Sequence, residues 1–365
     1  MLQPADGKIG TRELFAIFLI SIGIKLSDGT PMLLLEAGKN ATWVLPLVGG
    51  AIILVPTLLI LSLLKKYKNK NLVDIIFLVT GKYIGLIMCL IIFFAIIFAN
   101  ALNQRTTVNI ISTMFFPTTP IVIIFLLLIG SSFAVARVGI EAVGRTAWIV
   151  LPYIKVVLFL LFLLIINEIH FEFLFPIAGP GLDVLLKESF SYHTIFFEFI
   201  LVALFFPWVR DHKSYKTATL LAVGFIVVEM TITMAYFVMM FDYPQVAHVA
   251  YPFQQLTKLL EVGTIVTSYE GFFLGFWIMA AVVRFSIYLL LSAFIVSSMF
   301  QFKDYKPILL PLACITLLIG LIPENQTETT FFIRDVFLLQ LSWYFVTILP
   351  VFLWITNKVK ERFNG

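Results

Sequence analysis

Lys25-Leu26-Ser27-Asp28-Gly29-Thr30-Pro31 interrupts an otherwise apolar run from Leu14 to Leu35. About 20 helical residues cross the hydrocarbon core of a bilayer, so this run is long enough to span it and the interruption falls near its middle. Proline cannot donate a helix hydrogen bond, glycine tolerates most backbone angles, and short polar side chains compete for backbone groups. The stretch therefore predicts a helix broken at mid-membrane depth, where unpaired backbone groups must be buried in protein or line a wet cavity. A kinked helix without a ligand is the alternative.

The composition indicates a membrane protein. Hydrophobic residues make up 61% of the 365-residue chain, charged residues make up 13%, and the mean hydropathy is +1.02. A soluble chain of this composition would expose far too much apolar surface to water. We therefore expect an all-α integral membrane protein. Both cysteines, Cys89 and Cys314, lie in apolar segments and the four histidines are scattered, so we expect no disulfide and no metal site.

Hydropathy predicts about ten transmembrane helices in one domain, residues 1–365. The apolar segments are 14–37, 43–64, 84–112, 120–137, 146–167, 190–209, 217–241, 271–298, 307–322 and 333–356. Residues 71–82 form a short amphipathic stretch after a lysine cluster, and we expect it to lie along the cytoplasmic interface. In the long outer connection 242–270, apolar periodicity from Pro252 to Val262 predicts a surface helix.

The basic residues predict that both termini are cytoplasmic. With the N-terminus inside, most lysines and arginines between the spans fall on the cytoplasmic side, and four remain outside: Lys39, Lys187, Lys258 and Arg334. This asymmetry obeys the positive-inside rule, and an odd number of spans would spoil it at the C-terminus. The net charge of +4 is thus a topology signal, and we expect no nucleic-acid partner.

Ten spans divide into two sets of five. The first repeat would cover about 12–167 and the second about 189–356. A break in the first span of a half is typical of transporters built from inverted repeats. The sixth span, Ser189 to Trp208, would be the counterpart of the first, and it carries Glu198 near its middle and Pro207 at its inner end but no glycine. We therefore expect a 5+5 inverted repeat with broken first and sixth helices.

Seven charged residues lie within the predicted spans. They are Lys25, Asp28, Arg105, Lys155, Glu198, Glu229 and Arg284. Each would cost roughly 2.5–3.5 kcal/mol at the centre of a lipid-facing helix, so all are expected to face the interior. Basic and acidic members nearly balance, and pairing with one another is the alternative to a functional role for each.

The third span carries a polar sector. Asn100, Asn103, Gln104 and Thr107 follow helical spacing on one stripe, and Arg105 and Asn109 lie on the adjacent stripe. A polar sector on a central helix predicts a wet cavity beside it.

In the eighth span, Arg284 shares a face with Trp277, Ala281 and Tyr288. This small and aromatic setting could hold a carboxylate through charge-assisted hydrogen bonds. The alternative is an aromatic packing face on which Arg284 pairs with Glu198 or Asp28.

Lys155 in the fifth span is the candidate for proton coupling, because a buried lysine readily releases its proton. A permanent ion pair with Asp28 or Glu229 is the alternative. The usual motifs of hydrolases, zinc proteases and phosphate-binding loops are absent from the sequence, so we expect neither an enzyme nor a cofactor.

Several short motifs resemble the spore germination permease family, the B subunits of GerA-type nutrient receptors. In order they are Ala37-Gly38-Lys39-Asn40-Ala41-Thr42-Trp43, Gly81-Lys82-Tyr83-Ile84-Gly85, Thr119-Pro120, Gly139-Ile140-Glu141-Ala142-Val143-Gly144-Arg145, Phe175-Pro176 with Gly179-Pro180-Gly181, Glu198, Tyr251-Pro252, Glu270 and Trp277. Together they cover nearly the whole chain. Their order and spacing carry the resemblance.

The resemblance implies membership of the amino acid/polyamine/organocation transporter superfamily and a LeuT-like fold. It also implies a place beside an A-type membrane subunit and a C-type lipoprotein in the spore inner membrane, where the B subunit would recognise the germinant. Two departures fall at the expected pocket. Residues 25–30 are more polar than the glycine-rich stretch usual in the family, and Phe196 and Phe197 replace the small residue that normally precedes the glutamate.

We hypothesise a receptor subunit that binds a small nutrient, such as an amino acid, between the broken first span and spans three, six and eight. The expected ligand-binding residues are Ser27, Asp28, Gly29, Thr30, Asn103, Gln104, Arg105, Glu198, Arg284 and Tyr288. One alternative is a free-standing proton-coupled amino acid transporter, with Lys155 or Glu198 carrying the proton. Another is an ion or water conduit, which the polar third span would also fit.

Overall fold

The computed structural model describes residues 7–243, 245–249, 251–259, 269–323 and 340–364. Within these ranges the regular secondary structure is helical, apart from one isolated bridge between Ile9 and Val209, and short loops join the helices. The longer helices are α1 (Thr11–Gly23), α2 (Thr30–Gly38), α3 (Val44–Lys66), α4 (Leu72–Thr80), α5 (Lys82–Met114), α6 (Ile121–Val138), α7 (Ile140–Leu164), α8 (Leu182–Tyr192), α10 (His212–Phe241), α11 (Pro252–Leu259), α12 (Tyr269–Phe300), α13 (Lys306–Gly320) and α15 (Leu349–Asn364). Short helical turns join them: η1 (Ile24–Ser27), η2 (Lys39–Ala41), η3 (Ile166–Glu168), η4 (Phe171–Leu174), η5 (His193–Phe196), α9 (Glu198–Leu201), η6 (Val202–Trp208), η7 (Gln245–His248), α14 (Gln340–Trp343) and η9 (Tyr344–Ile348).

The described helices are those of a multi-pass membrane protein. Seven are long and apolar enough to cross a bilayer, and the bent pair of Thr11–Ser27 and Thr30–Ala41 makes an eighth. These eight match the first eight predicted spans. The predicted ninth span is α13, a shorter apolar helix, and the predicted tenth span, 333–356, begins outside the described residues.

The predicted break in the first helix is confirmed. The two halves meet at 66° around Asp28 and Gly29. Pro31 lies in the first turn of α2, where a backbone N–H would have no helical partner in any case. The side chain of Asp28 accepts hydrogen bonds from both the amide (2.8 Å) and the hydroxyl (2.7 Å) of Thr30, so it holds the start of the second half. Gly29 has a φ of −73°, an angle open to any residue, so the bend does not depend on its lack of a side chain.

The sixth helix is irregular and lacks a comparable bend. The span Leu182–Trp208 runs through α8, η5, α9 and η6, alternating between α and 3₁₀ winding. Among the described residues, the first helix provides the one short break bent by more than 40°. The break expected in the sixth helix is therefore not confirmed, although 3₁₀ winding lies on both sides of the short α-helical turn that begins at Glu198.

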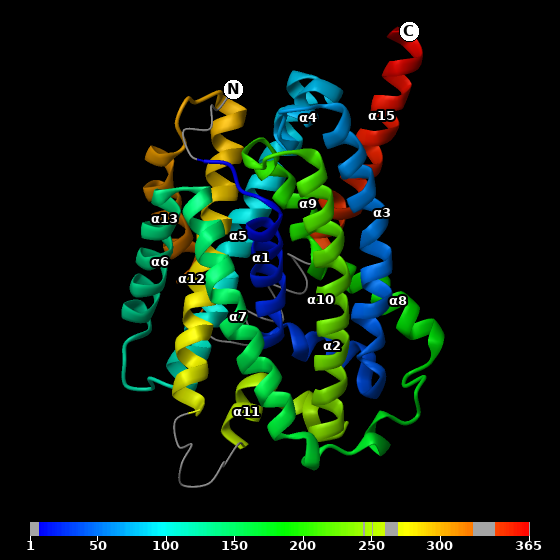
Figure 1. Ribbon diagram of the computed structural model, residues 1–365, viewed down its shortest axis with the longest axis vertical. Helices are drawn as coiled ribbons and strands as arrows, with labels where there is room; N and C mark the ends of the chain where they lie inside the picture. The colour runs from blue at the N-terminus through cyan, green and yellow to red at the C-terminus, as the bar shows by residue number, and fades with distance from the viewer. Residues whose placement is uncertain (1–6, 244, 250, 260–268, 324–339, 365) are drawn as a thin grey trace.

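The broken first helix lies inside the bundle. α1 packs against α7, α10 and α12, and α12 also contacts α5 and α6 (Figure 1). In both α12 and the sixth span, 83% of the residues in the apolar core of the helix are buried inside the protein. This central packing brings the break, the sixth helix, α5 and α12 around one point.

The first described residues and α15 lie at the same end of the bundle, with the short helix α4 beside them (Figure 1). This arrangement agrees with an even number of crossings. An Asn71 side chain that accepts from the Asp74 amide begins α4, which is the amphipathic stretch that the sequence predicted at the cytoplasmic interface.

Candidate functional site

Lys25 links the broken first helix to the sixth helix. Its ammonium donates to the Glu198 carboxylate at 2.7 Å and also to the backbone carbonyl of Ile195. The other oxygen of Glu198 accepts from the Tyr288 hydroxyl on α12 at 2.7 Å. The Lys25 ammonium lies 4.2 Å from the centre of the Phe197 ring, a cation–π distance. Burial is nearly complete, with side-chain exposures of 3% for Lys25 and 0% for Glu198, so each charge depends on its partner.

Asp28 and Arg284 form a second buried ion pair. The Arg284 guanidinium donates to Asp28 at 3.1 Å, and both side chains are at most 2% exposed. Of the two partners considered for Arg284 from the sequence, Glu198 and Asp28, the structure therefore selects Asp28. Two more nitrogens of Arg284, Nε and Nη2, are buried and have no hydrogen-bond partner. They are donors available to an anion, since a guanidinium can bind a carboxylate through two parallel hydrogen bonds.

Ser27 accepts hydrogen bonds from Trp277 and Gln254, two contacts that the sequence analysis did not predict. Its hydroxyl accepts from the Trp277 indole at 2.7 Å and donates to the Ile24 carbonyl at 2.8 Å. Its backbone carbonyl, freed by the break, accepts from the Gln254 side chain at 2.7 Å. Gln254 lies on α11, which was predicted as a surface helix. The structure corrects that prediction for the described part of 252–262: residues 252–254, 256 and 257 are buried, and α11 packs against η1. The signal in the sequence that could have indicated this burial is Gln254, a polar amide within an apolar-periodic segment.

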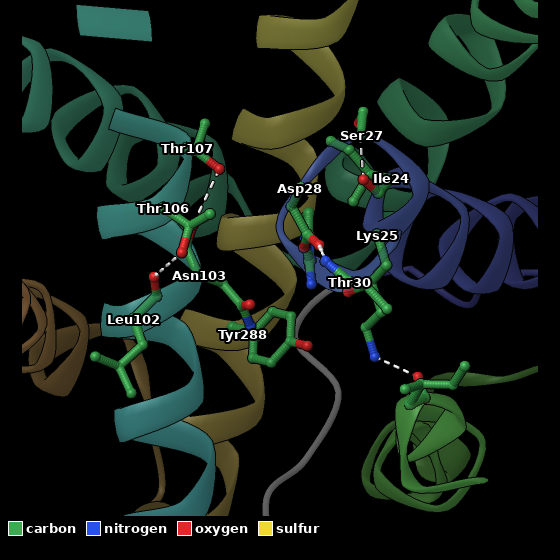
Figure 2. A network of polar contacts seen from close by, with 12 residues as sticks. Ile24, Lys25, Ser27, Asp28, Thr30, Leu102, Asn103, Thr106, Thr107 and Tyr288 are labelled. Atoms are coloured by element: carbon green, nitrogen blue, oxygen red, sulfur yellow. Dashed lines mark hydrogen bonds and ion pairs between the residues drawn. The ribbon is translucent and has the colours of Figure 1, made fainter. Parts of the chain in front are cut away.

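Figure 2 shows Tyr288 and Asn103 across from the break, on α12 and α5, while Lys25 extends away from it toward the sixth helix. Asn103 is thus a polar α5 residue that lies beside the site. Gln104 instead donates to Asn100 on its own helix at 3.0 Å, and its carbonyl oxygen is buried without a partner. Arg105 is buried on α5 with an exposure of 5%.

Lys155 belongs to a separate ion pair. Its ammonium donates to the Glu229 carboxylate, which selects Glu229 over Asp28 among the partners considered from the sequence. The second oxygen of Glu229 is buried without a hydrogen-bond partner. A methyl group added to Gly23 on α1 would lie 3.4 Å from the Lys155 ammonium, so the pair directly flanks the first helix. It lines a narrow, mainly apolar pocket with a cavity volume of about 50 Å³, which also reaches Ser27 and Trp277.

The site combines two opposite charge pairs with unsatisfied donors. Lys25 and Arg284 balance Glu198 and Asp28, so the four groups sum to zero charge. Such a site suits a zwitterion or a neutral polar molecule better than a free ion, because an unbalanced charge would be left buried. No group of three or more histidines, cysteines or carboxylates that could hold a metal occurs among the described residues.

The sequence resembles those of known proteins. A family model described as "Spore germination protein" matches residues 10–329. The chain is similar to spore germination protein KB of Bacillus subtilis (strain 168), with 23% identity over 365 residues, 97% of this chain and 96% of that protein. It is similar to spore germination protein XB of Bacillus anthracis, with 23% identity over 339 residues, 91% of this chain and 93% of that one. YfkT of Bacillus subtilis (strain 168) is 28% identical over 192 residues, which is 52% of each chain.

Proposed function

Because the chain belongs to the spore germination protein family, we propose that it is the B subunit of a germinant receptor in the spore inner membrane. In this proposal it binds a small nutrient, an amino acid, at the broken first helix. It acts beside an A-type membrane subunit and a C-type lipoprotein, which read its conformation. Its two halves, about 12–167 and 189–356, form a LeuT-like 5+5 arrangement.

The observation that carries the proposal is the position of the Lys25 ammonium. It occupies a carboxylate, Glu198, and a backbone carbonyl, Ile195, which together form the kind of acceptor set that holds a ligand ammonium. Arg284, one helical turn from the Tyr288 that binds Glu198, has two buried donors to spare for a ligand carboxylate. An α-amino acid carries both groups on one carbon atom. The protein thus supplies charges complementary to an amino acid, and in this structure the Lys25 ammonium takes the place of the ligand's ammonium.

This arrangement supports a switch. An amino acid would take over the contacts of the Lys25 ammonium, and the released lysine would no longer join the first helix to the sixth. A ligand shifts an equilibrium only through a difference in affinity between two states, and the exchange of one ammonium for another provides it. The break at Asp28 and Gly29 is the element that such an exchange would bias.

Germination of spores that carry Glu198→Gln tests the proposal. The variant keeps the side-chain shape but removes the charge that attracts an ammonium. We expect loss, or a changed preference, of the response to a panel of single amino acids and sugars, at a receptor level checked by immunoblot. Glu361→Gln is the matched control, because Glu361 is an exposed carboxylate on α15. Unchanged responses from the Glu198→Gln spores would refute the site.

The second candidate is a proton-coupled amino acid transporter. It is supported by the Lys155–Glu229 pair, which flanks α1 and has a spare carboxylate oxygen able to accept a proton. Purified protein in liposomes would then accumulate an amino acid in response to a pH gradient without other subunits. Lys155→Met would abolish this uptake. A receptor subunit would show no such accumulation.

A further inference from the structure

A second, larger pocket lies at the end of the bundle that carries the described N-terminal residues and α15. Its cavity volume is about 1,030 Å³, and its walls come from α4, the start of α5, the end of the sixth helix and the end of α12. The α4–α5 corner, the end of the sixth helix and the end of α12 lie far apart in the sequence. The site proposed above has no part in its lining.

The lining of this pocket is basic. Lys8, Lys70 and Lys82 all contribute, from three separate segments, and Asp74 is the one acidic side chain among its described lining residues. Asp74 already accepts a hydrogen bond from the Asn71 amide at 3.2 Å as part of the cap of α4. With three lysines and one carboxylate, the described lining carries a net positive charge that an anion would neutralise.

The N-terminal segment is fixed where it brings Lys8 to this pocket. The next residue, Ile9, forms the isolated bridge: its amide donates to the Trp208 carbonyl at 2.9 Å, and its carbonyl accepts from the Arg210 amide at 3.1 Å. Trp208 itself lines the pocket. The terminal lysine is thus anchored one residue away by backbone hydrogen bonds.

Two further features point to an anionic ligand. Ser297 is one of the lining residues, and its buried hydroxyl has no hydrogen-bond partner. The long helix α5 begins at Lys82, and no side chain caps its first turn. The free N–H groups at a helix start, together with the helix dipole, favour negative charge. The three lysines and the uncapped start of α5 at Lys82 both favour an anion in this pocket.

The rim of the pocket is apolar. Leu78 on α4 and Phe300 on α12 line it with exposures of 49% and 58%. We propose that the pocket binds the phosphate-bearing head group of an anionic phospholipid from the cytoplasmic leaflet, with the acyl chains against this rim. Basic pockets at the cytoplasmic ends of transmembrane helices bind such head groups. An acidic protein segment would match the lysines but would leave the apolar rim uncovered.

The experiment measures lipid affinity of the purified full-length protein in neutral detergent. The probes are short-chain phosphatidylglycerol, phosphatidylcholine with the same chains, and inorganic phosphate. The test variant is Lys8→Gln/Lys70→Gln/Lys82→Gln. The control is Lys213→Gln/Lys216→Gln/Lys303→Gln, which removes the same charge from exposed lysines outside the pocket lining.

We expect phosphatidylglycerol to bind more tightly than either other probe. Each pocket lysine contributes roughly fivefold, so the triple test variant should lose about 100-fold, while the control should lose much less. Equal losses in both variants would overturn the proposal, because they would show general surface attraction. Inorganic phosphate binding as tightly as the lipid would overturn the lipid assignment. Lys8→Gln alone, at an exposed terminal position, should lose roughly fivefold and serves if the triple variant does not fold.

Discussion

Replacing Lys25 and Glu198 singly and then together measures how strongly this buried ion pair joins the broken first helix to the sixth helix. Lys25→Met leaves a carboxylate of 0% exposure whose remaining contact to α12 is the Tyr288 hydroxyl at 2.7 Å. Glu198→Gln leaves a 3%-exposed ammonium with the Ile195 carbonyl. Removing one partner of a buried pair typically costs about 3–5 kcal/mol, because the other charge is left uncompensated.

The double variant Lys25→Met/Glu198→Gln removes both charges together. We expect it to cost much less than the sum of the single variants, with a coupling free energy of about 3 kcal/mol. The assay is equilibrium unfolding in mixed detergent micelles, followed by tryptophan fluorescence. The same cycle on the exposed pair of Lys66 and Glu361, 2.6 Å apart, is the control and should be additive. Additivity of the Lys25 and Glu198 variants within about 0.5 kcal/mol would refute the pair, and with it the proposed replacement of the Lys25 ammonium by that of a ligand.

Two further predictions concern helix packing and the C-terminal helix. A methyl group added to Gly50 on α3 would lie 2.2 Å from the Val227 side chain, so Gly50→Ala should destabilise the protein by about 1–3 kcal/mol. Gly130→Ala on α6 meets nothing within 4 Å and should be neutral or stabilise by up to about 1 kcal/mol; equal unfolding free energies for the two variants would contradict this. The hydrogen bond from Lys66 lowers the pKa of Glu361 below its usual 4.5, so this contact between α15 and α3 should persist above that pH and be lost as the pH falls through the lowered value. Spin-label distances between α15 and α3 should then broaden in acid, and unchanged distances would contradict the contact.

The two lysines of the membrane interior have different surroundings, although both form ion pairs. Lys25 lies against the sixth helix, where it contacts a carbonyl, a carboxylate and an aromatic ring. Lys155 is 22% exposed and its partner Glu229 keeps a free oxygen beside a pocket. Lys25 therefore suits a structural or ligand-mimicking role, and Lys155 remains the better candidate for exchanging a proton.

The membrane class, the first eight spans and the broken first helix could all be predicted from the sequence. These features are local. An apolar run of about 20 residues marks a span wherever it lies, and Pro31 cannot continue a regular helix through the residues before it whatever surrounds it. The resemblance to the germination family could also be read from short motifs, because their order along the chain does not depend on contacts.

The pairing of the charges was decided by the tertiary structure. The sequence left Arg284 with two possible partners and Lys155 with two, and it did not connect Lys25 to Glu198, 173 positions away. It also placed α11 on the surface, whereas the fold uses Gln254 to satisfy a carbonyl that the break sets free. A buried charge or carbonyl needs a partner, but the energetic cost of leaving it unpaired does not specify which residue the partner is. Only the packing of distant helices determines which residue is close enough.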